Sequence, residues 1–544
     1  MNGLNRSGER GPAVVIIGGG ASGALAAIAL LNLSGSQRCP VRIVMIDRYG
    51  RHGLGQAYST THPDHLLNAP ADQMSAVAGD PKHLIRWAEA AGEDTTGFLP
   101  RRVYGRYLRQ ALDEAVRDAA PLASLTLLTG DVVSVGPGAV GPGAAAPVSV
   151  GPGPGPGAGS REPALRLVTS AGDELGADVA VLATGSLPPT LPFPTPQSRR
   201  IVVDPWAPGA LDEVADGSEV LVLGTGLTAI DLALTVTSGH PGAVVHLVSR
   251  HGLLPRPHRE AHDDRRPVRL PEIEALAAAR PAAPQTAAEL RLSDLMALVS
   301  AALAANPGSW PEVMDALRPC VPAFWQAMPV GDQRVFLSRL SRFWEVHRHR
   351  VPQATGRRIT ELRRSGRLVL RQGRITGVTE YGSGLRVELA TAGAGAGAAA
   401  DAAAGAGSAA GAGSAAGAGS AAGAGGQTSR LDVGWLLNGT GQGTDVARTA
   451  DPLWRDLLDA GLARPDPHGL GLAASAHGAL LDRSGQPSGV LFTLGPVLRG
   501  QWYETTAVPE IRAQAAALAK VIAERVDILS SKQTDIIGNS AGSS

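Results

Sequence analysis

A pattern that occurs twice in this chain constrains its fold more than any other feature. Residues 13–31 read AVVIIGGGASGALAAIALL, and residues 219–236 read EVLVLGTGLTAIDLALTV. Each begins with an apolar run typical of a buried strand, continues through a glycine-rich turn and ends in an apolar helix. A Rossmann-type dinucleotide-binding fold requires this order of elements. We therefore expect an α/β protein with two Rossmann-like domains.

The first unit has the full glycine motif and an acidic residue at the right place. Gly18, Gly20 and Gly23 permit a tight turn, close approach of a pyrophosphate and close helix packing. The helix that includes Ser22 offers free N–H groups at its start. The following strand, VRIVMID, ends at Asp47, whose carboxylate suits the ribose 2′-hydroxyl of an unphosphorylated adenosine. These residues predict an FAD site.

The second unit lacks an acidic residue at the end of its second strand. Its motif is Gly224-x-Gly226-x-x-Ala229, and its second strand, AVVHLVSR, ends in Ser249 and Arg250. A guanidinium at this position accommodates a 2′-phosphate, so NADPH is favoured over NADH. The alternative is that Arg250 belongs to a solvated basic turn. Two such folds in one chain suggest that hydride passes from NADPH to a flavin.

Composition limits the classes of partner. The chain has 544 residues, 44% of them hydrophobic, which is enough for two or three packed domains. Lys plus Arg and Asp plus Glu both total 49, so net charge indicates neither nucleic acid nor an anionic membrane as partner. The two cysteines, Cys39 and Cys320, are far apart, and no segment reaches the roughly 20 apolar residues of a membrane span. We expect a cytoplasmic protein.

Two low-complexity inserts, 136–160 and 393–426, interrupt the strand-like parts of the chain. Both are rich in Gly and Ala, the first also in Pro, and we expect them to be disordered loops between hairpin strands. With these inserts set aside, the chain divides into five parts and a tail. The expected parts are FAD-binding 12–200, NADPH-binding 201–265, a helical insertion 266–352, an NADPH-domain return meander 353–442, FAD-binding 443–528 and a flexible tail 529–544.

The segment that follows the FAD-type strand is a polar loop, GLGQAYSTTHPDHLLNAPADQMS, at 53–75. Its position predicts that it folds over the flavin, with Gln56, Asn68 and Met74 lining the pocket. His65 is the candidate polar group closest to the ring, and we treat His65 and Asn68 as catalytic candidates. The alternative is a polar loop tied down by its own hydrogen bonds.

The helical insertion is rich in Arg. Arg339, Arg342, Arg348 and Arg350 can present guanidinium groups to a carboxylate substrate, and Arg350 is the chosen candidate for that contact. The alternative is that most of them are exposed helix charges.

A pair of histidines has a spacing compatible with a metal. His258 and His262 stand four residues apart in RPHREAHDD, but Pro257 and the dense charge predict a surface turn instead. We expect no metal site.

Several stretches resemble a known group of proteins. VLATGSLPP at 181–189 and LLNGTGQ at 436–442 are similar to the crossover segments of flavoproteins with two dinucleotide folds. The loop 53–75, WEVHRHRVP at 344–352 and GPVLRGQWYETTAVPEIRAQAAALA at 495–519 resemble the bacterial FAD/NAD(P)-binding proteins grouped with nitrosuccinate-forming L-aspartate N-monooxygenases. More distantly, the chain is similar to FAD-dependent urate hydroxylases and N-hydroxylating flavin monooxygenases.

This resemblance implies further cofactor contacts. It implies that Gly185 lies in a crossover beside FAD, and that Gly495 and Pro496 lie beside the flavin ring. The helix that begins near Pro509 would point its N-terminus at the ring, where its dipole favours negative charge. Disulfide reductases have an acid where this chain has Pro496, and the chain has no CxxC, so disulfide reduction is disfavoured.

The implied activity is that of a flavin-dependent monooxygenase. It would use FAD, NADPH and molecular oxygen to hydroxylate the amine of a small substrate, with oxidation of L-aspartate to nitrosuccinate as the best candidate. The implied partner is thus a small molecule, an amino acid, and the oligomeric state stays open. Three alternatives are also open: a C-hydroxylase of a urate-like ring, a flavoprotein reductase without oxygen transfer, and a nucleotide-binding sensor.

Overall fold

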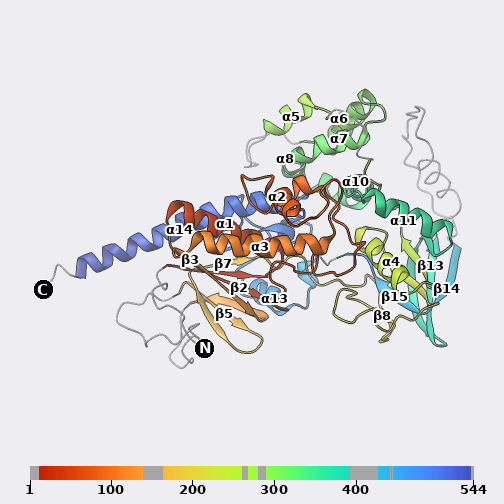
Figure 1. Ribbon diagram of the computed structural model, residues 1–544, viewed down its shortest axis with the longest axis horizontal. Helices are drawn as coiled ribbons and strands as arrows, with labels where there is room; N and C mark the ends of the chain where they lie inside the picture. The colour runs from red at the N-terminus through yellow and green to blue at the C-terminus, as the bar shows by residue number, and fades with distance from the viewer. Residues whose placement is uncertain are drawn as a thin grey trace.

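The structure is a computed structural model that describes residues 11–138, 163–259, 267–279, 290–391, 427–441, 443 and 445–540. Two lobes lie side by side, each built around one parallel sheet (Figure 1). The lobe at the left of that view contains α1 (Ala21–Gln37), α3 (Arg101–Ala119) and α14 (Val508–Ser540), and the other contains α4 (Leu227–Gly239) and α11 (Gln353–Arg364). The fold is the mixed α/β fold that the sequence predicts.

The first sheet has six strands in the order β16-β17-β7-β1-β2-β3, parallel except at the β16–β17 pair. Every residue of β1 and β7 is buried, because helices α1, α3 and α14 cover one face and a meander with α13 covers the other. This explains why both strands are continuous apolar runs. The strands are β1 (Ala13–Ile17), β2 (Val41–Asp47), β3 (Ala123–Thr129), β7 (Val179–Leu182), β16 (Ala479–Leu481) and β17 (Pro487–Thr493), and α13 is Pro452–Asp459.

The second sheet repeats this plan in the order β11-β10-β9-β15-β8. Helices α4 and α11 pack on one face and a second meander packs on the other. The strands are β8 (Ile201–Val202), β9 (Glu219–Leu223), β10 (Val244–Ser249), β11 (Leu368–Gln372) and β15 (Trp435–Asn438).

Both low-complexity inserts lie where the sequence predicts, between paired antiparallel strands. The first connects β4 (Val132–Pro137) to β5 (Leu165–Thr169), and the second connects β13 (Gly384–Thr391) to β14 (Gln427–Val433). Each pair is completed to a three-stranded meander by β6 (Glu174–Ala177) or β12 (Arg374–Tyr381). Residues 136–137 of the first insert belong to β4, and the expected disorder of 139–160 and 393–426 lies outside the described residues.

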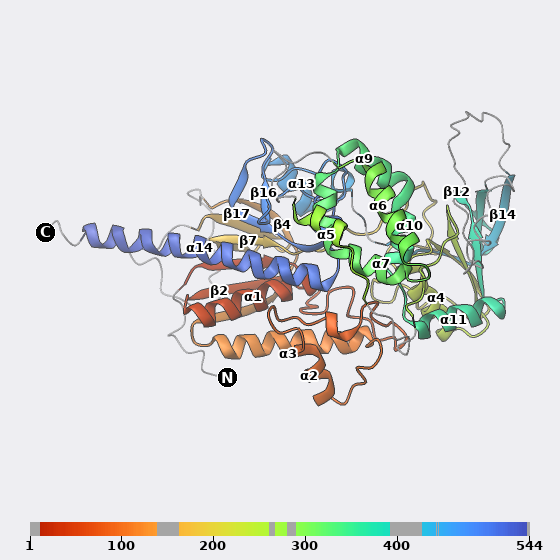
Figure 2. The same ribbon diagram turned by 90° about the horizontal axis from the view of Figure 1, so that it is seen from above.

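The helical insertion lies above the junction of the two lobes (Figures 1 and 2). It has its own apolar core and is fastened to the first lobe, where the indole of Trp325 donates to the carbonyl oxygen of Gly500 at 2.8 Å and Arg318 pairs with Glu510. Its helices are α5 (Pro271–Ala278), α6 (Leu292–Ala305), α7 (Trp310–Leu317), α8 (Val321–Ala327), α9 (Val330–Val335) and α10 (Ser341–Arg348), with a π-helical turn at Phe336–Leu340.

The C-terminal helix differs from the expected end of the chain. The sequence predicts a flexible tail from residue 529, but α14 continues to Ser540 and projects away from the first lobe (Figure 2). The segment contains no proline, so nothing in it removes a backbone donor and stops the helix.

Candidate functional site

The first glycine turn is shaped by contacts that exclude side chains. Gly18 has φ +107°, and a Cβ atom there would overlap the carbonyl oxygen of Ala183, which follows β7. A Cβ atom at Gly23 would overlap the carbonyl oxygen of Gly18, so the first turn of α1 packs directly on the loop. Gly20 is the N-cap of α1. The turn therefore presents bare backbone where the sheet order changes direction between β1 and β7.

A cavity of about 590 Å³ lies at this switch point. We call it the switch-point cavity. It has the size usual for small-molecule and cofactor sites. Its wall includes seven residues that the sequence predicts as cofactor contacts, namely Gly18, Gly20, Ser22, Asp47, Gln56, Gly185 and Pro496. Thr228, Asn438 and Gly441 of the second lobe also line it, so the cavity lies between the two nucleotide folds.

Asp47 has a structural task in addition to the predicted one. Its Oδ2 accepts a hydrogen bond from the backbone N–H of Gly19 at 3.1 Å, and its Oδ1 accepts from Tyr49 at 3.0 Å and Arg51 at 2.8 Å. These bonds hold the glycine turn against the chain that leaves β2. A carboxylate has about four acceptor positions, so one is left for a ribose hydroxyl in the cavity.

The first half of the loop 53–75 reaches the cavity. The N–H of Gly53 donates to the carbonyl oxygen of Gly19 at 2.7 Å. Gly55 lies against Gly20, and a Cβ atom on Gly55 would be only 2.8 Å from the Cα atom of Gly20. This contact brings Gln56 and Tyr58 into the cavity wall. The loop therefore crosses the glycine turn, as its position after β2 suggests.

His65 is the first correction to the candidate catalytic residues. It is 1% exposed and its ring nitrogens bond to Thr60, at 2.7 Å, and to the carbonyl oxygen of Asp231 in α4, at 3.0 Å. The Thr235 hydroxyl is also 3.0 Å from Nε2. Burial lowers the pKa of His65 to about 4, so its ring is neutral. It ties the loop to the second lobe and does not line the cavity.

The second half of the loop also departs from the prediction. Asn68 does not line the cavity, and its backbone carbonyl oxygen accepts a hydrogen bond from His258 Nε2 at 3.0 Å. Met74 is 4% exposed and belongs to the apolar core that includes α1, α3 and α14. The contact with Asn68 also corrects the expected surface turn at His258, where burial lowers the pKa to about 4. His262 lies outside the described residues.

The second glycine turn has the same backbone as the first. Gly224 has φ +113°, and a Cβ atom there would overlap the carbonyl oxygen of Gly439, which follows β15. Gly226 is the N-cap of α4, and Ala229 packs beneath the turn with 0% exposure. Ser249, at the end of β10, accepts a hydrogen bond from the hydroxyl of Thr225 at 3.0 Å. This turn lies between β9 and β15, the switch point of the second sheet.

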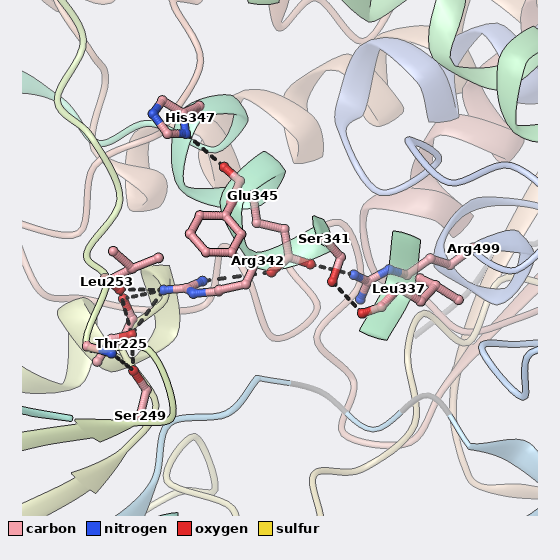
Figure 3. Close-up of polar contacts among 11 residues, drawn as sticks. Thr225, Ser249, Leu253, Leu337, Ser341, Arg342, Glu345, His347 and Arg499 are labelled. Carbon is pink, nitrogen blue, oxygen red and sulfur yellow. Dashed lines mark hydrogen bonds and ion pairs between the residues drawn. The ribbon is translucent and has the colours of Figure 1, made fainter. Parts of the chain in front are cut away.

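Arg342 closes the second turn, and sequence reasoning placed it elsewhere. Its guanidinium donates to the carbonyl oxygens of Thr225, at 3.1 Å, and of Leu253, at 2.7 Å (Figure 3). It also contacts Glu345, which accepts a hydrogen bond from Arg499 at 3.0 Å. Arg499 lines the switch-point cavity, so charged side chains connect the second glycine turn with that cavity. Arg250 is exposed beside the turn.

The other arginines of the insertion do not form one carboxylate site. Arg350, the chosen candidate for the substrate carboxylate, has a buried side chain that pairs with Asp315. Arg348 pairs with the buried Glu504 at 3.2 Å, and Arg339 is exposed. Burial alone would raise the pKa of Glu504, but the positive charge of Arg348 and other donors lower it overall. Arg348 and Arg350 are close in the sequence, but their side chains do not form one site, because each pairs with a different acid.

The end of β17 completes the cavity. Gly495 has φ +78° and lies close to the hydroxyl of Ser22, while its N–H donates to the side-chain carbonyl of Gln514 at 2.8 Å. Pro496 and Val508, the first residue of α14, line the cavity. The free N–H groups at the start of α14 therefore lie at its wall, as the motif at 495–519 implies.

Further lining residues carried a positional signal in the sequence. Gly130, Asp204 and Asn438 stand at or just after the ends of β3, β8 and β15. Strand ends at a switch point are where ligands bind in such sheets, so this position identifies them. Arg499 had no comparable signal, because the fold of the insertion determines its surroundings.

Among the residues that the structure describes, no cluster of three or more His, Cys, Asp or Glu side chains could hold a metal ion. None of the described helices is both long and apolar enough to cross a bilayer.

Comparison with known proteins agrees with this geometry. Residues 15–145 match a family model described as FAD-NAD(P)-binding. This range contains most of β1 and all of α1, β2 and the loop 53–75, which together contribute to the wall of the switch-point cavity. No curated protein matches the chain in sequence.

Solved structures share the fold over nearly the whole chain. L-lysine 6-monooxygenase from Pseudomonas syringae is 14% identical with a TM-score of 0.56, and reduced ornithine hydroxylase from Pseudomonas aeruginosa is 13% identical with a TM-score of 0.55. Ornithine N-hydroxylase from Kutzneria sp. 744, with reduced FAD, NADP⁺ and L-ornithine, is 14% identical with a TM-score of 0.52. Each covers 95% of this chain and 100% of its own. At such identities the likeness establishes the fold.

Proposed function

We propose that this protein is an FAD- and NADPH-dependent monooxygenase that hydroxylates the amine of a small substrate. The observation that carries the proposal is the switch-point cavity, whose wall runs from the first glycine turn to Thr228 and Asn438 of the second nucleotide fold. Hydride transfer between two nucleotides requires such a shared space. The solved structures of similar fold include lysine and ornithine hydroxylases, which supports N-hydroxylation.

The residues present fit FAD at the first turn. The positions of Gly18 and Gly23 leave no room for side chains, and the start of α1 supplies free N–H groups for a pyrophosphate. Asp47 is held at the cavity wall with acceptor capacity for a ribose. Bound FAD would supply the redox chemistry of the site, because it can accept hydride from NADPH and activate molecular oxygen.

Backbone and side-chain groups of the chain prepare the site for this chemistry. The free N–H groups at the start of α14 favour negative charge at the wall formed by Pro496 and Val508. Arg499 places a guanidinium at the same cavity, held by Glu345. The insertion lies above the junction of the two lobes (Figure 1). No nucleophilic side chain is required, because oxygen and the substrate amine form the new bond.

The first candidate substrate is L-aspartate, oxidised to nitrosuccinate. In the first oxidation one oxygen atom enters an N–H bond, and the other leaves as water with two electrons from NADPH and a proton. Formation of nitrosuccinate requires further oxidation of the same nitrogen. The resemblance of the loop 53–75 and of residues 495–519 to L-aspartate N-monooxygenases supports this substrate.

The test is to incubate FAD-loaded protein with NADPH, oxygen and L-aspartate, and to measure N-oxygenated product and nitrite alongside hydrogen peroxide. We expect product to follow NADPH consumption. Succinate, which lacks the amine, is the control and should give peroxide alone. Peroxide as the sole product from L-aspartate, L-ornithine and L-lysine would contradict N-hydroxylation, and ring-hydroxylated product from urate would favour a C-hydroxylase.

A further inference from the structure

A second cavity, of about 450 Å³, lies between the helical insertion and the C-terminal part of the first lobe. We call it the Arg334 pocket. The residues that matter here are Arg334, Ser338 and Ser341 from the insertion, and His468, Arg499 and Tyr503 from the first lobe. Arg499 also lines the switch-point cavity, so the two cavities share one lining residue.

An unusual helical segment forms one side of the pocket. Residues Phe336–Leu340 form a π-helical turn between α9 and α10, and Leu337 and Ser338 of this turn line the pocket. Single π-turns are rare and occur frequently at functional sites, because they move side chains out of the regular helical rows. The local backbone thus indicates a binding surface at this place.

Two arginines line the pocket, and one of them, Arg499, is already paired with Glu345 beside the lining. Arg334 is exposed, and Arg499 is partly exposed, with its guanidinium 5.7 Å from the centre of the Tyr503 ring. Among the described residues that line the pocket, none is acidic. Arg334 can donate two parallel hydrogen bonds to a ligand carboxylate. Arg499 keeps N–H donors beyond the one that it gives to Glu345, so it can also contact a carboxylate. A second ammonium group, as in ornithine or lysine, has no matching charge in this lining.

The hydrogen bonds around His468 determine its tautomer. The Gln333 amide donates through Nε2 to the carbonyl oxygen of Trp325 at 2.6 Å, so its Oε1 is the atom that faces His468 Nε2 at 2.6 Å. His468 therefore carries its hydrogen on Nε2, and Nδ1 is an acceptor. Burial lowers the pKa of His468, Asp466 partly opposes this and Arg334 adds to it, so the ring is neutral.

Two polar atoms of the pocket residues lack a hydrogen bond of standard geometry. Within the described part of the chain, His468 Nδ1 is buried and makes no hydrogen bond. The Tyr503 hydroxyl is buried too and makes no hydrogen bond of standard geometry, although the guanidinium of Arg499 is close enough to offset part of the rise that burial causes in the pKa of the phenol. Such groups are uncommon in folded proteins and point to a missing water or ligand. A ligand with both donor and acceptor groups, such as an amino acid, has the chemistry to complete them.

We propose that the Arg334 pocket binds the carboxylates of a small anionic amino acid between Arg334 and Arg499, with its amine directed past Arg499 into the switch-point cavity. This inference rests on the proposed function, because it makes that amino acid the substrate. It assigns the preference for an acidic over a basic amino acid to the two guanidinium groups. Arg334 is a specificity-determining residue, and Arg499 contacts the substrate where the two cavities meet.

The test measures binding apart from turnover. L-Aspartate and succinate are titrated calorimetrically into FAD-loaded protein without NADPH. We expect Arg334→Gln to weaken both at least tenfold. Arg339→Gln is the matched control, because Arg339 is an exposed arginine of the same π-helical turn that does not line the pocket, and it should change binding less than twofold. L-Lysine should bind the unmodified protein at least tenfold more weakly than L-aspartate.

The substituted residues, Arg334 and Arg339, are both exposed, so a change in binding would not result from a change in folding. Arg334 is exposed, so its replacement should leave the fold and the FAD absorbance unchanged. Equal affinity of Arg334→Gln and the unmodified protein for L-aspartate would overturn the inference, as would failure of both probes to bind the unmodified protein.

Turnover then separates this inference from the proposed function. If L-aspartate binds in an Arg334-dependent way and no N-oxygenated product forms, the reaction is wrong and the pocket stands. If product forms and Arg334→Gln leaves the KM for L-aspartate unchanged, the pocket is wrong and the reaction stands. Tyr503→Phe, which removes only the phenol hydroxyl, should raise that KM with little effect on kcat.

Discussion

The two glycine turns are the same backbone structure placed in two different environments. Gly18 has φ +107° against the chain after β7, and Gly224 has φ +113° against the chain after β15. In each case the turn lies at a switch point and a helix begins directly after it. The first turn faces an open cavity beside Asp47, whereas the second is contacted by Arg342 from the insertion.

This difference teaches which part of a nucleotide site a motif can encode. Local sequence encodes the cradle, because φ near +110° and the absence of Cβ atoms are properties of glycine itself. The groups that surround the cradle come from other parts of the chain: the loop 53–75 at the first turn and α10 at the second. The two turns are therefore equivalent in shape and different in what they recognise.

The largest expected effect comes from filling each cradle in turn. Gly18→Val places a side chain against the Ala183 backbone at positive φ and should cost about 4 kcal/mol or more locally, with loss of FAD. Gly224→Val is the matched change and should keep FAD while abolishing reduction by NADPH. The measurements are FAD absorbance after gel filtration and anaerobic reduction of the bound flavin.

Gly97→Ala is the control for these variants, because a Cβ atom there meets nothing within 4 Å. It should retain both FAD and reduction. A yellow, fully loaded Gly18→Val protein would show that the first turn does not bind FAD, and equal loss of FAD in both valine variants would remove the distinction between the turns.

A smaller effect is expected at His65, which belongs to the loop that crosses the first turn and bonds to Asp231 in α4, the helix that follows the second turn. Its pKa is lowered from 6.5 to about 4 in the folded protein, so the unfolded chain binds more protons between these values. Stability should therefore fall as pH decreases from 6.5 to 4, by about 3 kcal/mol from this residue. Urea unfolding at pH 7 and pH 4.5 checks this expectation.

His65→Gln sharpens that measurement, since an amide can donate to Asp231 and accept from Thr60 without titrating. We expect the variant to lose less stability than the unmodified protein at low pH. His258, whose pKa is also about 4, is present in both proteins and cancels in the comparison. Parallel loss of stability in the two proteins would mean that His65 is not neutral in the fold.

The smallest expected effect concerns the cofactor preference of the second turn. Arg250→Ala should raise the KM for NADPH by about tenfold, roughly 1.4 kcal/mol, and change the KM for NADH less than twofold, because only NADPH carries the 2′-phosphate. Arg374→Ala, another exposed arginine of the second lobe, should change neither value. Steady-state kinetics with both nucleotides provides the measurement, and equal effects on them would remove the preference for NADPH.

Much of the scaffold was predictable, because it depends on local patterns. The strands that end at Ile17 and Asp47, the helices that follow both glycine turns, and the helix start near Pro509 appear as the sequence predicts. Hydrophobic runs and glycine spacing carry this information over fewer than 40 residues. Several cavity residues were predictable for the same reason, since they stand at strand ends.

The catalytic candidates were less predictable, because a polar residue in a loop has no local signal for its partner. His65 is buried in a contact with Asp231, 166 residues away in the sequence, and Arg350 is buried in a contact with Asp315, 35 residues away. Arg342, expected at a substrate carboxylate, instead contacts the second glycine turn. These contacts depend on how the loop 53–75 and α10 pack against the second lobe, and on how the helices of the insertion pack against one another.

By itself, the sequence determined two dinucleotide cradles, the order of their strands and helices, and the meanders that hold the inserts. Only the tertiary structure decided that a single cavity joins the two folds and that Arg499 belongs to both this cavity and the Arg334 pocket. The physical reason is the range of the interactions. Backbone conformation and burial periodicity act between near neighbours in the chain, whereas charge pairing and cavity shape arise from segments that folding alone brings together.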